Sequence, residues 1–173
     1  PEPSGCSPRL LHRHRRFGSP AVAREHEHVE DLVDSVAPGQ QVSYSGDTER
    51  GAALAARAKQ LNPNHPGFYW FADFYNAYCQ QDYRGALAAA LKLNLPGHMG
   101  AHMVLAAAYG QLGEREAAEK AVRDLLKVRP DFASVARGVL RQWWTPEYVE
   151  RLIDGWRKAG LEVAPAHFAV TRP

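Results

Sequence analysis

The chain has 173 residues, and its 21 basic side chains nearly balance 19 acidic ones, for a formal net charge of +2. A chain of this length forms one ordinary domain, and the balanced charge gives no electrostatic reason to expect nucleic acid as a partner. Its apolar runs are shorter than the roughly 20 residues that cross a bilayer, so we expect no membrane partner either. The two cysteines, Cys6 and Cys79, lack metal-binding or redox spacing and fit a cytoplasmic protein.

Residues 1–45 differ in amino-acid composition from the rest of the chain. Prolines, arginines and four histidines are mixed there with few large apolar side chains. Such a segment buries little surface, and we expect it to be poorly ordered or atypical. Residues 25–36 have the composition of a short helix, which Pro38 and Gly39 would end. Because the chain begins with Pro1 rather than methionine, we interpret it as a fragment of a longer protein.

From residue 46 onward the sequence carries helical periodicity, interrupted by turn residues. We predict a first helix that begins after Asp47 and stops at Asn62, followed by helices over residues 68–80, 84–93, 98–111, 115–128, 132–143 and 146–159. Asp47 is the expected N-cap of the first helix. Thr145 followed by Pro146 is a strong start signal for the last. The array is therefore assigned to residues 46–161, and residues 162–173, which show no periodicity, form a predicted tail.

Three prolines give the helical region a period. Pro63, Pro96 and Pro130 stand 33 and 34 residues apart, and each closes an alanine-rich stretch of helical pattern. A recurrence of about 34 residues is typical of helix–turn–helix repeats that stack into a solenoid. Such scaffolds bind partners more often than they catalyse reactions, so the spacing favours a binding function.

The most regular unit, residues 99–130, resembles a tetratricopeptide repeat. At the matching positions, small residues let two helices approach and larger residues fill the space between the helices. These positions are Leu105, Ala106, Tyr109, Ala118, Val122, Leu125 and Pro130. The preceding unit matches less completely, and the one before it matches only in its second helix. The resemblance implies an all-α, antiparallel helical-hairpin solenoid of about two and a half repeats plus a C-terminal capping helix.

The resemblance narrows further at residues 62–70, 88–97, 106–113 and 152–161. These segments look like the C-terminal repeat region of bacterial multidomain signalling proteins, which carry a nucleotide cyclase, kinase or DNA-binding domain ahead of the repeats. This implies a protein–protein interaction or regulatory scaffold module that binds a peptide or a neighbouring domain. The alternative is an oligomerisation module, because few hairpins with an open end are marginally stable alone.

In tetratricopeptide arrays the first helix of each unit lines a concave groove, and this register predicts a groove for a partner. The predicted groove residues are Phe68, Phe71, Tyr75, Tyr78, Met103, Ala107, Arg137 and Arg141. Aromatic and arginine side chains are frequent anchors of protein interfaces, and the arginines favour an acidic segment. The alternative is that these aromatics pack in the core against neighbouring helices.

No catalytic or cofactor site is expected in this chain. His98 and His102 are four residues apart on a helix, but the sequence nearby supplies no acidic or cysteine partner for a metal. The glycine patterns do not match a phosphate-binding loop. Cys79 lies on an apolar helix, where an unpaired cysteine acts as a small hydrophobe. We therefore predict that the chain is not itself an enzyme and binds no cofactor.

Overall fold

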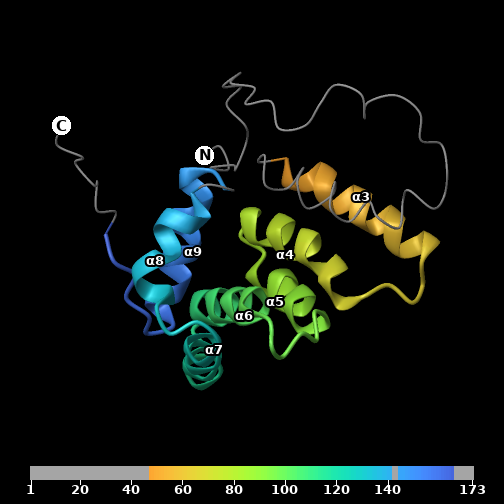
Figure 1. Cartoon of the computed structure of the whole chain (residues 1–173). Helices are drawn as coiled ribbons and strands as arrows, with labels where there is room; N and C mark the ends of the chain where they lie inside the picture. Colours follow the sequence, from red (N-terminus) through yellow and green to blue (C-terminus); the bar gives the residue numbers. More distant parts are fainter. Residues whose placement is uncertain (1–46, 142–143, 166–173) are drawn as a thin grey trace, which may run out of the picture.

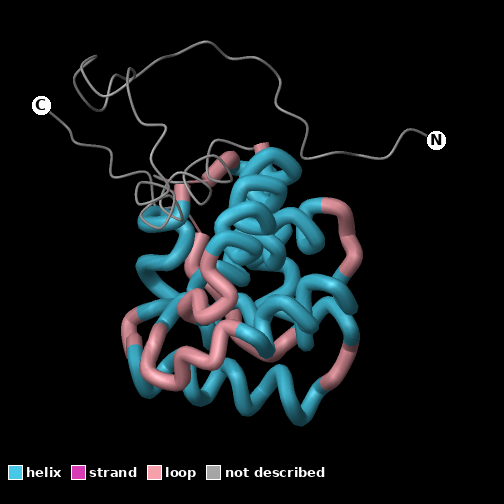
Figure 2. Tube along the Cα trace, turned by 90° about the vertical axis from the view of Figure 1, so that its right-hand side faces the viewer, coloured by secondary structure: helices cyan, strands magenta, loops and turns pink. Residues whose placement is uncertain are grey.

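A computed structural model describes residues 47–141 and 144–165 of the chain. These residues form helices joined by short loops, with no strand among them (Figures 1 and 2). The elements are α3 (Thr48–Leu61), the short 3-10 helix η2 (Gly67–Tyr69), α4 (Trp70–Cys79), α5 (Tyr83–Lys92), α6 (Met99–Leu112), α7 (Arg115–Val128), α8 (Phe132–Leu140) and α9 (Pro146–Lys158). The all-α prediction is confirmed for this part of the chain, whereas the prediction for residues 1–45 lies outside the described residues.

The helices begin and end where the sequence places capping residues. The side chain of Asp47 accepts a hydrogen bond from the Arg50 amide at 3.1 Å, which caps α3. At α9, the Thr145 hydroxyl accepts from the Tyr148 amide at 3.4 Å, with proline in the first turn. Gly113 ends α6 with φ of 73°, a left-handed conformation that favours glycine. Local capping chemistry therefore sets these boundaries, whereas α4, α7 and α8 begin without a side-chain cap.

Helices α3 to α7 pack in chain order, each against the next (Figure 1). Only residues 80–82 separate α4 from α5, and only residues 113–114 separate α6 from α7. Connections this short place consecutive helices side by side and antiparallel. The hairpin arrangement fits the predicted repeat pattern, and a tetratricopeptide-like solenoid remains a prediction.

The C-terminal helix α9 packs against α6, and α8 lies beside it (Figure 1). The α6–α9 contact is unusually close. A Cβ atom at Gly110 would lie 2.0 Å from the carbonyl oxygen of Gly155, and one at Gly155 would lie 2.7 Å from that of Ala107. The two glycines therefore let the two backbones touch, and the chain covers α6 with its own last helix.

The core runs from α4 to α9 as one cluster. Its largest fully buried side chains include Phe74, Tyr78, Leu125 and Trp156. Cys79 also lies in this cluster, but its sulfur is disulfide-bonded, which corrects the expectation of an unpaired cysteine.

Candidate functional site

The predicted groove residues do not line an open groove. Five of the eight are at most 4% exposed: Phe71, Tyr75, Tyr78, Met103 and Ala107. Phe68 is 39% exposed, on η2. Arg137 and Arg141 lie at the end of α8, where both reach α9. The alternative in which the aromatics pack in the core describes Phe71, Tyr75 and Tyr78, and Met103 and Ala107 are buried with them.

Helix α9 and Trp144, which lies just before it, cover the buried aromatic side chains of α4. The ring of Tyr75 lies 4.2 Å from that of Trp144 and 6.0 Å from that of Tyr148, measured between centroids. Trp144 and Tyr148 stack on each other at 4.6 Å. The apolar face of α9 that lies over α4 and α6 is at most 2% exposed at Tyr148, Val149, Leu152, Ile153 and Trp156. Helix α9 therefore covers the faces of α4 and α6 that the sequence analysis predicted to bind a partner.

The two predicted groove residues on α6 also contact α9. The indole Nε1 of Trp156 donates a hydrogen bond to the carbonyl of Met103 at 2.8 Å. Ala107 lies against Gly155, where a Cβ atom on the glycine would come within 2.7 Å of the Ala107 carbonyl oxygen. Both positions therefore hold α9 in place and are not available to a ligand.

The two arginines bind a carboxylate of the same chain. Arg137 and Arg141 both donate to Oε1 of Glu150 on α9, the second at 2.9 Å. Burial raises the pKa of Glu150, but the hydrogen bonds from the two guanidinium groups outweigh it and hold the pKa below its usual value. Arg137 also donates to the carbonyl of Ala164 at 3.3 Å. Both guanidinium groups are thus engaged by α9 and the segment after it, rather than lining the predicted groove.

A polar network joins α4, α6 and α9 beneath the aromatics. The hydroxyl of Tyr78 donates to the carbonyl of Arg151 at 3.1 Å, and Gln111 bonds to Asp154 at 3.1 Å. Lys158 completes it, donating to Asp154 at 2.8 Å and to Gln111 at 2.7 Å. Burial raises the pKa of Tyr78, so its hydroxyl stays protonated and acts as a donor. Tyr78 therefore has a structural role.

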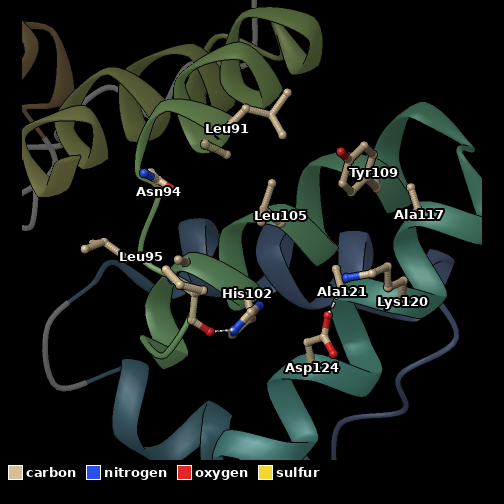
Figure 3. A pocket seen from close by; sticks show the side chains of 13 residues that line it. Leu91, Asn94, Leu95, His102, Leu105, Tyr109, Ala117, Lys120, Ala121 and Asp124 are labelled. Atoms are coloured by element: carbon tan, nitrogen blue, oxygen red, sulfur yellow. Dashed lines mark hydrogen bonds and ion pairs between the residues drawn. The ribbon is translucent and has the colours of Figure 1, made fainter.

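An open cleft lies instead on the side formed by α5, α6 and α7 (Figure 3). Its volume is about 320 Å³. Leu91 of α5 and Leu105 of α6 face it from opposite sides, and Tyr109 follows one turn after Leu105 (Figure 3). Leu91 is 56% exposed. The cleft is therefore a largely apolar surface open to solvent.

The rim of the cleft is polar. On α7, Asp124 binds Lys120 at 2.8 Å and Lys127 at 2.9 Å. The hydrogen bonds from these two lysines lower the pKa of Asp124 to about 2. On the other side, Nε2 of His102 donates to the carbonyl of Pro96 at 2.6 Å (Figure 3). Lys120 and Asp124 line the cleft, whereas Lys127 binds Asp124 from outside the lining.

The low pKa of Asp124 predicts a small, pH-dependent contribution to stability. Asp124→Asn should lower the free energy of unfolding by roughly 0.5 kcal/mol at neutral pH, because exposed ion pairs contribute little. A lowered carboxyl pKa stabilises the fold above the ordinary value of 3.8, and that stabilisation is lost as pH falls toward about 2. Urea titrations of both proteins between pH 7 and pH 2 should therefore converge at the acid end. A difference that persists at pH 2 would contradict this account.

The structure assigns the two helical histidines to local hydrogen bonds. His98 caps α6, because its Nδ1 accepts from the Gly100 amide at 3.1 Å. Among residues 47–141 and 144–165, no group of three or more histidine, cysteine, aspartate or glutamate side chains is placed to hold a metal. Within the same residues, no helix has both the length and the apolar character to span a membrane.

Comparison with family models, with curated proteins and with solved structures finds no match to the chain.

Proposed function

We propose that the chain is a protein–protein interaction module, and that its α5–α6–α7 cleft binds a segment of a partner protein. The observation that supports this most directly is Leu91. At 56% it is the most exposed large hydrophobic side chain in the described part of the protein, and it stands at the mouth of an apolar cleft. Apolar surface left open beside polar residues is typical of an interaction site.

The chemistry of the cleft favours a peptide with one large apolar side chain beside an acidic residue. The volume of about 320 Å³ is at the small end of ligand pockets, which suits one anchoring side chain better than a whole small molecule. Lys120 and Asp124 line the cleft, and Lys127, just outside it, also binds Asp124, so two ammonium groups share this one carboxylate. The excess positive charge there complements an acid on the partner.

The resemblance of the sequence to the repeat region of bacterial signalling proteins supports a regulatory setting for this interaction. In our proposal the partner segment belongs to another protein or to a neighbouring domain of a longer chain. The module itself positions that partner and catalyses no reaction.

A peptide library displayed on phage and selected against the full chain would test the cleft. We expect enriched peptides to combine a leucine or aromatic residue with an adjacent acid. Leu91→Glu should weaken the binding of a selected peptide at least about tenfold, because it places a charge where the apolar anchor sits. Titration calorimetry with the purified proteins would measure this.

The matched control for this experiment is Val139→Glu. Val139 is 39% exposed and lies on α8, so it introduces the same charge outside the cleft. Peptide affinity should remain as in the wild type. Selection of no peptide, or equal loss of binding in both variants, would contradict the proposal.

A further inference from the structure

A second cleft lies one helical hairpin before the cleft that we propose binds the partner. It is formed by α3, α4 and α5, and its volume is about 320 Å³. Each residue that α6 and α7 contribute to the α5–α6–α7 cleft has a counterpart in this α3–α4–α5 cleft, 32 positions earlier in the chain. Examples of these pairs are Trp70 and His102, Asp73 and Leu105, and Lys92 and Asp124. The two clefts therefore occupy equivalent positions in two consecutive hairpins.

The walls of the two clefts differ in their chemistry. In the α3–α4–α5 cleft, Asp73 takes the place of the apolar Leu105. Lys59 likewise stands 32 positions before the exposed Leu91. The ammonium group of Lys59 binds Asp73 at 2.5 Å and lies 3.7 Å from the centroid of the Trp70 ring. Polar groups thus replace, in the earlier cleft, the two leucines that make the later cleft apolar.

The charges around the α3–α4–α5 cleft balance one another. Its lining includes the carboxylates of Asp73 and Asp82 and the ammonium group of Lys92. Lys59, which binds Asp73, supplies a second ammonium group. Asp82 in turn caps α5 by accepting from the Gly85 amide at 2.9 Å. A charged side chain of a partner would meet a like charge as well as an opposite one, which favours a neutral polar group instead.

Two carboxamide side chains give this cleft hydrogen-bonding capacity. Asn76 and Gln80 both line the cleft and stand one helical turn apart. The Oδ1 atom of Asn76 accepts from the Thr48 hydroxyl and from Nε2 of Gln80, both at 3.3 Å. Among the described residues, no hydrogen bond uses Nδ2 of Asn76 or Oε1 of Gln80. A donor and an acceptor that stand together in this way match another carboxamide, which carries one of each.

The two clefts are close enough for one short segment to reach both. Helix α5 packs between α4 and α6 and contributes lining residues to each cleft (Figure 1). On its outer surface, the exposed Ala88 lines the earlier cleft, and the exposed Leu91, one turn later, lines the later cleft. A helix is about 10 Å across, so roughly three or four residues of extended chain, at about 3.3 Å each, cross it.

We infer that the partner segment crosses α5 in an extended conformation and binds in both clefts, an inference that rests on the proposed function. Its large apolar side chain enters the α5–α6–α7 cleft beside Leu91. An asparagine or glutamine about three or four residues away enters the α3–α4–α5 cleft and bonds to Asn76 and Gln80. The partner is therefore recognised by two side chains of different chemistry at a fixed spacing.

Phage selection of random peptides, carried out on the wild-type chain and on two variants, tests this inference. Peptides enriched on the wild type should carry an asparagine or glutamine about three or four residues from the large apolar side chain. Gln80→Ala removes the acceptor of the α3–α4–α5 cleft. Asn76→Asp removes the donor but keeps the oxygen to which Thr48 and Gln80 donate. Selection on either variant should keep the apolar residue and lose the preference for a carboxamide.

Titration calorimetry with a peptide selected on the wild type measures the size of the effect. Gln80→Ala should weaken binding about fivefold, as expected for the loss of one neutral hydrogen bond. The matched control is Gln60→Ala, because Gln60 is an exposed glutamine of α3 that lines neither cleft. This control should bind the peptide as the wild type does.

The outcomes separate this inference from the proposed function. Enriched peptides that share the apolar residue but no carboxamide at a fixed spacing would overturn the inference and leave the proposed function intact. Equal affinity of the wild type and Gln80→Ala, or an equal loss in Gln80→Ala and Gln60→Ala, would do the same. Absence of any enriched peptide would overturn both.

Discussion

Replacing Gly155 with alanine is expected to destabilise the protein by about 3 kcal/mol, although alanine is the better helix former by about 1 kcal/mol. A Cβ atom there would lie 2.5 Å from the hydroxyl oxygen of Tyr78 and 2.7 Å from the carbonyl oxygen of Ala107. The carbonyl belongs to the backbone of α6 and cannot rotate away. The whole of α9 would have to move outward, which separates Trp156 from its acceptor at Met103.

Urea denaturation followed by circular dichroism would measure the loss, with Gly138→Ala as the control. Gly138 also lies inside a helix, α8, but a Cβ atom there meets nothing within 4 Å. That variant should gain about 0.5–1 kcal/mol, because alanine loses less chain entropy than glycine on folding. If Gly155→Ala were also stabilising, the close packing of α9 on α6 would be wrong.

The helices themselves could be predicted from the sequence because their signals are local. The predicted range 115–128 coincides with α7, and the expected caps at Asp47 and Thr145 accept the hydrogen bonds that a cap should. Capping residues, prolines and apolar periodicity act within a few residues of one another. Such signals are complete in the sequence, so no knowledge of the packing was required.

The burial of the aromatic face of α4 beneath α9 could not be predicted from local signals. Tyr75 and Tyr78 on α4 are covered by a helix about 70 residues further along the chain, as the Tyr78–Arg151 hydrogen bond between residues 73 apart shows. Apolar periodicity states that a face is buried and not what buries it. The repeat register assigned the face to a partner, whereas α9 occupies it.

The open cleft was missed for a related reason, although a signal for it was present. The buried residues of α5 include Ala86, Ala89 and Ala90, so Leu91 falls on the opposite, exposed face. A leucine on the polar side of an alanine-rich helix is a local inconsistency worth testing as a contact residue. Its neighbours across the cleft, Leu105 and Tyr109, were assigned only to filling the repeat.

Substitutions of Tyr78 are expected to have the second large effect on stability. They test whether Tyr78 is a core residue or a residue that contacts a ligand. The side chain is fully buried, and its ring lies 5.2 Å from those of Phe74 and Tyr83. Tyr78→Ala should cost about 3–5 kcal/mol because it leaves a cavity in the core. Tyr78→Phe keeps the ring and should cost about 1–2 kcal/mol, because the carbonyl of Arg151 loses its hydroxyl donor.

Phe68→Ala is the informative comparison, since Phe68 belonged to the same predicted groove but is 39% exposed. Its free energy of unfolding should stay within about 0.5 kcal/mol of the wild type, as for most surface substitutions. Chemical denaturation of the three variants would give the ranking directly. A Tyr78→Ala protein as stable as Phe68→Ala would return Tyr78 to the surface and reopen the concave groove as the binding site. The expected ranking, with Tyr78→Phe between the other two, instead keeps Tyr78 in the core and agrees with our proposal that a partner binds elsewhere, at the α5–α6–α7 cleft.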